Sequence, residues 1–143
     1  MEKLLSLADP AVSYQTVNNR SIYSLINLVR KGLEYNLFEL LVEKSPFNIK
    51  DWSSFLHISE RTMQRYQKEN KLFDSLQTEK IVEITLLYRY GIEVFGDNEK
   101  FVLWLNTSNV ALGGISPRTL LDNHFGIELV KDTLTRIEHG ILA

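Results

Sequence analysis

Apolar residues recur at helical spacing through most of the chain after residue 20. From Ser21 onward they fall three and four residues apart, and a second short run follows Gly32 and stops at Pro46. This spacing predicts two helices that pack on a common core. Residues 1–20 show no such period, and we expect them to form a flexible lead-in.

The segment from residue 48 to 70 predicts two short helices joined by about three residues. Asn48 is a candidate N-cap with Asp51 in the first turn, and Ser59 is a candidate N-cap for the second helix. His57 takes the turn position that glycine usually occupies, so it must adopt a left-handed or bridge conformation. The apolar side chains that we expect to point inward are Trp52, Phe55, Leu56, Met63 and Tyr66.

A long apolar helix is predicted from about Leu76 to Phe95. One stripe is formed by Ile81, Ile84, Tyr88, Ile92 and Phe95, and it is widened by Val82, Leu86 and Tyr90. A stripe this wide needs cover on more than one side. We therefore expect a homodimer whose interface includes this helix.

Shorter helices are predicted beyond Gly96. Asp97 or Asn98 can cap a helix that holds Phe101 and Trp104, and the NVALGG stretch predicts a loop. Ser116 followed by Pro117 predicts the start of another short helix, and the last helix is expected to begin near Gly126.

The composition supports an all-α fold. Seven glycines and three prolines are few, and dense short strands separated by turn residues are absent. The lack of cysteine excludes disulfides, thiolate metal sites and a cysteine nucleophile. No uncharged apolar run is long enough to span a bilayer, so we expect a soluble, cytoplasmic protein.

Charge divides the chain into two parts. Residues 1–75 carry ten Lys/Arg and nine Asp/Glu, a net of +1, whereas residues 76–143 carry six and nine, a net of −3. A part that meets phosphate should therefore lie in the first half, and the acidic half suits another partner. We expect a DNA-binding domain over residues 21–75 and a second domain over residues 76–143.

The two short helices match a helix-turn-helix, which inserts its second helix into a major groove. Arginine and glutamine can bond to guanine and adenine edges, so we expect Arg61, Gln64 and Arg65 to read bases. Lys68 and Lys71 would hold phosphates. The alternative is a helical hairpin whose charges face water, with Glu60 and Glu69 pairing with nearby cations.

The last helix carries a continuous inward stripe of Ile127, Val130, Leu134, Ile137 and Ile141. Arg136 and His139 therefore face outward. A surface pair with Asp132 would account for Arg136, and Gly140 after the helix cap would account for the end of the helix. Spacing alone favours this structural explanation over a binding function.

A further pattern covers about 50 residues at the C-terminal end. The pieces are VFGD, WL, N.ALGG, SP..LL and G...V...L.RIEHG, in that order. They closely resemble the toxin-binding domain of the Xre/MbcA/ParS family of bacterial antitoxins. The ISERTMQR segment resembles the DNA-binding half of that family less distinctively.

This resemblance implies a type II antitoxin that neutralises a RES-domain toxin, which depletes NAD. The C-terminal region would cover the active site of the toxin, and the toxin-antitoxin complex would bind and repress its own promoter. Within that complex we expect this chain to be a homodimer. The resemblance implies toxin contact by Arg136, Glu138, His139, Gly140 and Ile141. Gly113 and Gly114 would support it, although a tight turn explains those glycines equally well.

An enzyme is not expected, and neither is a cofactor or a metal. His57, His124 and His139 lie far apart, and the chain has no glycine-rich phosphate loop and no nucleophile elbow. The alternatives are a helix-turn-helix regulator without a toxin partner and a helical adaptor that binds only protein.

Overall fold

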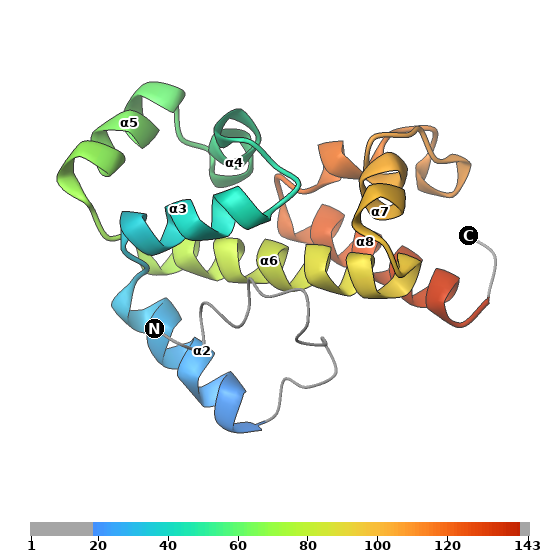
Figure 1. Cartoon of the computed structure of the whole chain (residues 1–143), viewed down its shortest axis with the longest axis horizontal. Helices are drawn as coiled ribbons and strands as arrows, with labels where there is room; N and C mark the ends of the chain where they lie inside the picture. The colour runs from blue at the N-terminus through green and yellow to red at the C-terminus, as the bar shows by residue number, and fades with distance from the viewer. Residues whose placement is uncertain (1–18, 141–143) are drawn as a thin grey trace.

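The computed structural model describes residues 19–140, and its regular elements are helices (Figure 1). The prediction of an all-α fold is confirmed, since the described residues contain two isolated β-bridges and no strand. The predicted lead-in, residues 1–20, falls almost wholly outside the described residues. The elements in chain order are α2 (Asn19–Lys31), α3 (Tyr35–Lys44), α4 (Ile49–Leu56), α5 (Glu60–Glu69), α6 (Ser75–Phe95), α7 (Asn98–Leu105), η2 (Val110–Leu112), η3 (Pro117–Leu120) and α8 (His124–Glu138).

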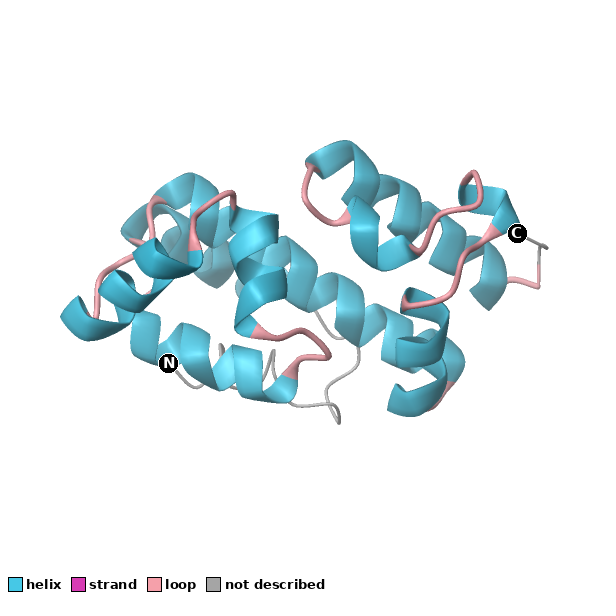
Figure 2. Ribbon diagram, turned by 90° about the horizontal axis from the view of Figure 1, so that it is seen from above, coloured by secondary structure: helices cyan, strands magenta, loops and turns pink. Residues whose placement is uncertain are grey.

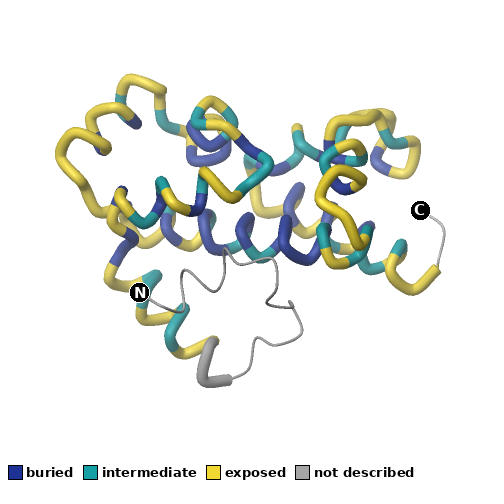
Figure 3. The backbone as a smooth tube through the Cα atoms, in the orientation of Figure 1, coloured by how far each residue is buried: buried dark blue, intermediate teal, exposed yellow. Residues whose placement is uncertain are grey.

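The long helix α6 is the spine of the molecule. It contacts α2 and α4 towards one end and α7 and α8 towards the other, and Figures 1 and 2 show the two groups of helices separated along it. The helix begins at a capping box formed by Asp74 and Gln77 and ends at Gly96, whose φ is 73°. Its middle is buried on several sides, as the tube coloured by burial shows (Figure 3).

One continuous hydrophobic core joins the two ends of the spine. It includes Trp52 and Phe73 from the first half, Ile84 from α6, and Phe101 and Leu134 from the second half. The wide apolar stripe on α6 is largely covered within the chain: Val82 and Tyr90 are only 6% and 5% exposed, and Leu86, Ile92 and Phe95 are half-buried. The width of this stripe therefore no longer argues for a second copy, and the homodimer stays a prediction. The boundary near residue 75 falls at the start of α6 and also stays a prediction.

The sequence signals at the helix ends are mostly confirmed. Asn48, Ser59 and Asp97 are N-caps, and each accepts a hydrogen bond from a backbone N–H of the following turn. The last helix begins at His124, because the amide oxygen of Asn123 accepts a bond of 2.8 Å from the backbone of Gly126. No helix among residues 19–140 has both the length and the apolar character needed to cross a bilayer.

The stretches around the NVALGG loop are more tightly wound than expected. The NVALGG stretch contains a 3-10 turn, η2, and the short helix after Ser116 is also 3-10. In the latter, Thr119 bonds to the carbonyl of Ser116 through both its backbone N–H (3.1 Å) and its hydroxyl (2.7 Å), which tightens the turn.

Candidate functional site

The helix-turn-helix is formed by α4 and α5 with three residues between them. Asn48 and Asp51 form a capping box at the start of α4, and the hydroxyl of Ser59 accepts a 3.0 Å bond from the backbone N–H of Thr62 at the start of α5. His57 has φ 57° and ψ 38°, which is the left-handed one of the two conformations predicted for it. The turn therefore has the helix-turn-helix connection, with histidine in the place of glycine.

Helix α5 separates an apolar inner side from a polar outer side. Met63 and Tyr66 are 1% and 8% exposed and hold the helix on the core. The predicted base-reading and phosphate-binding side chains are exposed, namely Arg61, Gln64, Arg65, Lys68 and Lys71. The structure thus brings the predicted residues together on and just after one exposed helix.

The cations of α5 are available for an external anion. Within residues 19–140 neither Glu60 nor Glu69 forms an ion pair with them, so the expected pairing is absent. The choice between DNA contact and a hairpin whose charges face water stays a prediction. The Lys71 Nζ lies 4.7 Å from the centroid of the Tyr66 ring, and the Arg65 guanidinium carbon lies 5.9 Å from it. The ring of Tyr66 therefore lies beside two of the predicted DNA contacts.

The inward stripe of α8 is confirmed as far as the described residues extend. Ile127, Val130 and Leu134 are at most 3% exposed, Ile137 is half-buried, and Ile141 lies outside the described residues. Arg136 and His139 are exposed on the opposite side. No ion pair joins Asp132 to Arg136 in the described part of the chain, so the expected surface pair does not account for Arg136.

The end of α8 has the geometry of a glycine C-cap. Gly140 has φ 71°, and its N–H donates to the carbonyl of Ile137 at 3.1 Å. Glu138 is held from inside the chain, because the Tyr90 hydroxyl donates a hydrogen bond to its carboxylate. Of the predicted toxin contacts, Arg136 and His139 are the charged or titratable side chains that project freely among the described residues.

Gly113 and Gly114 form a tight turn. Both have positive φ, 82° and 80°, and the N–H of Gly114 donates to the carbonyl of Asn109 at 2.9 Å. A β-bridge between Asn109 and Ile115 closes the same turn. The tight turn therefore accounts for both glycines, and their direct contact with a partner stays a prediction.

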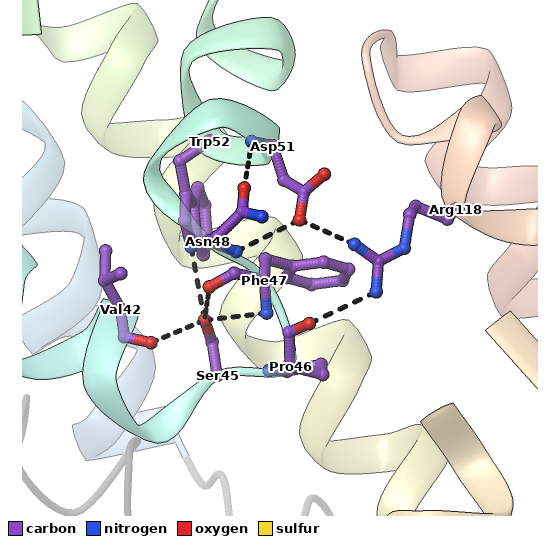
Figure 4. A network of polar contacts seen from close by, with 8 residues as sticks. All are labelled: Val42, Ser45, Pro46, Phe47, Asn48, Asp51, Trp52 and Arg118. Atoms are coloured by element: carbon purple, nitrogen blue, oxygen red, sulfur yellow. Dashed lines mark hydrogen bonds and ion pairs between the residues drawn. The ribbon is translucent and has the colours of Figure 1, made fainter. Parts of the chain in front are cut away.

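Sequence reasoning missed a contact between the two halves at Arg118 (Figure 4). The Arg118 Nη1 donates to Asp51 Oδ2 at 2.6 Å, Nη2 donates to the carbonyl of Pro46 at 3.2 Å, and the guanidinium carbon lies 5.3 Å from the Phe47 ring centroid. Asp51 is also the residue that closes the capping box of α4. No local pattern could have shown this contact, because the two charged residues are 67 positions apart.

The turn of the helix-turn-helix makes a second contact with the other half. His57 Nε2 lies 2.6 Å from the carbonyl oxygen of Asp122, and because that oxygen only accepts, Nε2 carries the proton. Lys80 donates to the same carbonyl at 3.1 Å. The loop between η3 and α8 is therefore fixed against both the turn of the helix-turn-helix and α6.

The arrangement defines a class of protein: a helix-turn-helix module joined by a shared spine to a helical module whose last helix, α8, ends in exposed residues. Two family models match these parts in order. The antitoxin Xre-like helix-turn-helix domain matches residues 24–85, and the antitoxin Xre/MbcA/ParS C-terminal toxin-binding domain matches residues 91–140.

Two proteins named antitoxin Xre are similar to this chain. The one from Photorhabdus laumondii is 24% identical over 117 residues, which cover 81% of this chain and 79% of that protein. The one from Yersinia enterocolitica is 29% identical over 87 residues, which cover 60% of this chain and 59% of that protein. The chain belongs to the Xre/MbcA/ParS family of antitoxins, as its C-terminal motifs predicted.

Proposed function

We propose that this protein neutralises a RES-domain toxin by covering its active site with the end of α8, and that it represses its own promoter through α5. The toxin would deplete NAD when it is free. The observation that supports neutralisation most is the pair of outward side chains, Arg136 and His139, at the end of a module that matches a toxin-binding domain. A site that binds the phosphates of a dinucleotide is suited to receive such polar groups.

The support for promoter binding is independent of the toxin. Arg61, Gln64 and Arg65 lie exposed on the second helix of a helix-turn-helix, and the arginines have no carboxylate partner in the described part of the chain. Arginine and glutamine in this position can bond to base edges in the major groove. Neither activity requires catalytic chemistry from this chain.

Co-expression with the candidate toxin, which is the product of the gene next to this one, tests the proposal. Cells that carry the toxin alone should lose NAD and stop growing, and cells that also carry the full chain should keep both. A chain that lacks residues 141–143 should fold normally but protect poorly, because the deletion removes the end that would enter the toxin.

Two outcomes would contradict parts of this proposal. If the full chain binds its promoter but never protects cells from the neighbouring gene product, the protein is a regulator without that toxin partner. If the truncated chain protects as well as the full chain, the last three residues do not cover the active site.

A further inference from the structure

The outward side of α8 carries an apolar pair in addition to its charges. Phe125 is 86% exposed and Leu129 is 44% exposed. They are four residues apart and are therefore neighbours on the helix surface, and Asp132 and Arg136 continue the same stripe at steps of three and four. The stripe runs from an apolar start to a cationic end.

This apolar pair is not part of the hydrophobic core of the chain. Ile127, Val130 and Leu134 fill that role from the opposite side of α8. An exposed aromatic ring beside an exposed leucine on the same helix face can anchor a protein interface, because one partner pocket can bury both side chains.

We propose that Phe125 and Leu129 form the apolar anchor of the toxin contact and enter an apolar pocket of the toxin that has a basic rim. The inference rests on the proposed function and extends it from the end of α8 to the start of that helix. The partner is a toxin because both residues lie inside residues 91–140, the part that matches a toxin-binding domain.

The acidic charge of residues 91–140 supports a basic rim around the toxin pocket. Residues 91–140 carry seven Asp/Glu and four Lys/Arg, a net of −3. Glu128 and Asp132 are exposed beside the apolar pair, and neither forms an ion pair with a described residue. An acidic border around an apolar anchor is complementary to a basic border around an apolar pocket.

The proposed contact follows the length of α8. Phe125 and Arg136 are eleven positions apart, which corresponds to about 16 Å along the helix axis at the usual rise per residue. The toxin would therefore meet the whole outer stripe, with the apolar pair fixing its position and Arg136 reaching the active site.

Calorimetric titration of the purified product of the neighbouring toxin gene tests this surface. Phe125→Ala should weaken binding by about tenfold or more, and Leu129→Ala should weaken it by a smaller factor, as expected for a central and a flanking contact. The matched control is Leu76→Ala, which removes a side chain that is 75% exposed in the first turn of α6, outside the toxin-binding match. The control should bind as the wild type does, and thermal melts of all three variants should be unchanged.

The outcomes separate this inference from the proposed function. Normal toxin affinity of Phe125→Ala overturns the anchor while the proposed function stands. If Phe125→Ala instead dissociates a homodimer in light scattering and leaves toxin affinity unchanged, the pair contacts a second copy and the inference is overturned. If the wild-type chain does not bind the toxin, the proposed neutralisation fails together with the anchor.

Discussion

At the scale of single residues, His57 serves the local turn and the packing of the two halves. A left-handed conformation is unfavourable for most residues with a side chain. Here the side chain that makes the conformation unfavourable also bonds to the carbonyl of Asp122, 65 positions away. Glycine would relieve the strain but remove the bond, which gives a physical reason for histidine at this position.

Arg136→Ala tests the residue that we expect to reach the toxin active site. The variant should keep its thermal stability, because Arg136 is exposed and forms no ion pair among the described residues. Its affinity for the toxin should fall by about 1–2 kcal/mol, as for an arginine contact at an interface. The measurement is a binding titration together with NAD levels in co-expressing cells.

The control for that variant is Arg30→Ala, which removes an exposed arginine from the last turn of α2. It should leave both toxin affinity and NAD protection unchanged. Equal affinities of the two variants and the wild type would show that Arg136 does not contact the toxin.

The burial of Tyr88 should make the free energy of unfolding fall in alkaline solution. Burial raises the pKa of Tyr88 to about 12, with the nearby charge of Arg89 opposing the shift, from an ordinary value of 10.0. The unfolded chain ionises first, so the contribution of Tyr88 to the free energy of unfolding is complete below about pH 10 and is lost as the pH rises towards 12. Urea denaturation at a series of alkaline pH values measures this loss.

Tyr88→Phe should reduce the alkaline loss. The hydroxyl is buried without a hydrogen-bond partner among the described residues, so its removal should be neutral or stabilising by up to about 1 kcal/mol near neutral pH. Tyr23→Phe, at a side chain that is 69% exposed, is the matched control. An unchanged alkaline loss in Tyr88→Phe would assign the loss to another group.

At the scale of elements, α5 exposes polar and charged side chains to solvent, whereas α8 exposes both apolar and charged side chains. Tyr66 holds α5 from beneath and keeps the cations of Arg65 and Lys71 near its ring. Helix α8 likewise has one buried side and one exposed side, and its buried stripe determines which residues face outward. Each helix can therefore bind a different partner without losing its place in the core.

Arg61→Ala and Arg65→Ala test α5 as the DNA-reading element. Each should weaken promoter binding by about 1–3 kcal/mol, because a lost guanine contact costs about that much. Both should leave toxin affinity unchanged, since α5 lies at the other end of the spine. Electrophoretic mobility shift at two salt concentrations measures the first effect, with Lys100→Ala in α7 as a control that should retain wild-type DNA affinity.

The helices were largely predictable from the sequence because caps and apolar spacing are local signals. Asn48, Ser59 and Asp97 mark helix starts that the structure confirms. The close approach of α6 and α7 was not predictable, since Gly91 looks unremarkable in a helix. A Cβ there would lie 2.1 Å from the Phe101 ring, so glycine is what allows the two helices to pack.

The candidate sites were predictable in part. Periodicity gave the outward position of Arg136 and His139, and the turn pattern gave α5. The contacts of Arg118 and His57 depend on residues 67 and 65 positions away, which no local pattern connects. Phe125 was also missed, because an isolated aromatic residue at the start of a helix does not reveal its exposure.

At the scale of the whole molecule, the two halves share α6 and one core. Trp52 lies in the first half and Trp104 packs against the same core in the second. The Arg118 contacts with Asp51 and Pro46 add a polar connection at the surface of that core. The protein should therefore unfold as one cooperative unit, even though its two partners would bind at opposite ends.

Arg118→Ala tests this connection. It should lower the free energy of unfolding by about 1–3 kcal/mol, because it removes the ion pair with Asp51, which keeps only its capping-box donor, and the hydrogen bond to the carbonyl of Pro46. In a Trp104→Phe background, the fluorescence of Trp52 reports the first half and circular dichroism reports all helices. Both transitions should coincide and shift together in Arg118→Ala, whereas a shift in only one of them would indicate halves that unfold independently.

The shared core has a consequence for how such a protein would be removed from a cell. A protease that unfolds the chain from either end must disrupt α6, and with it the support of both α5 and α8. No partly degraded form would keep one activity and lose the other. Release of the toxin and relief of promoter repression would then occur in the same event, with a timing set by one unfolding rate.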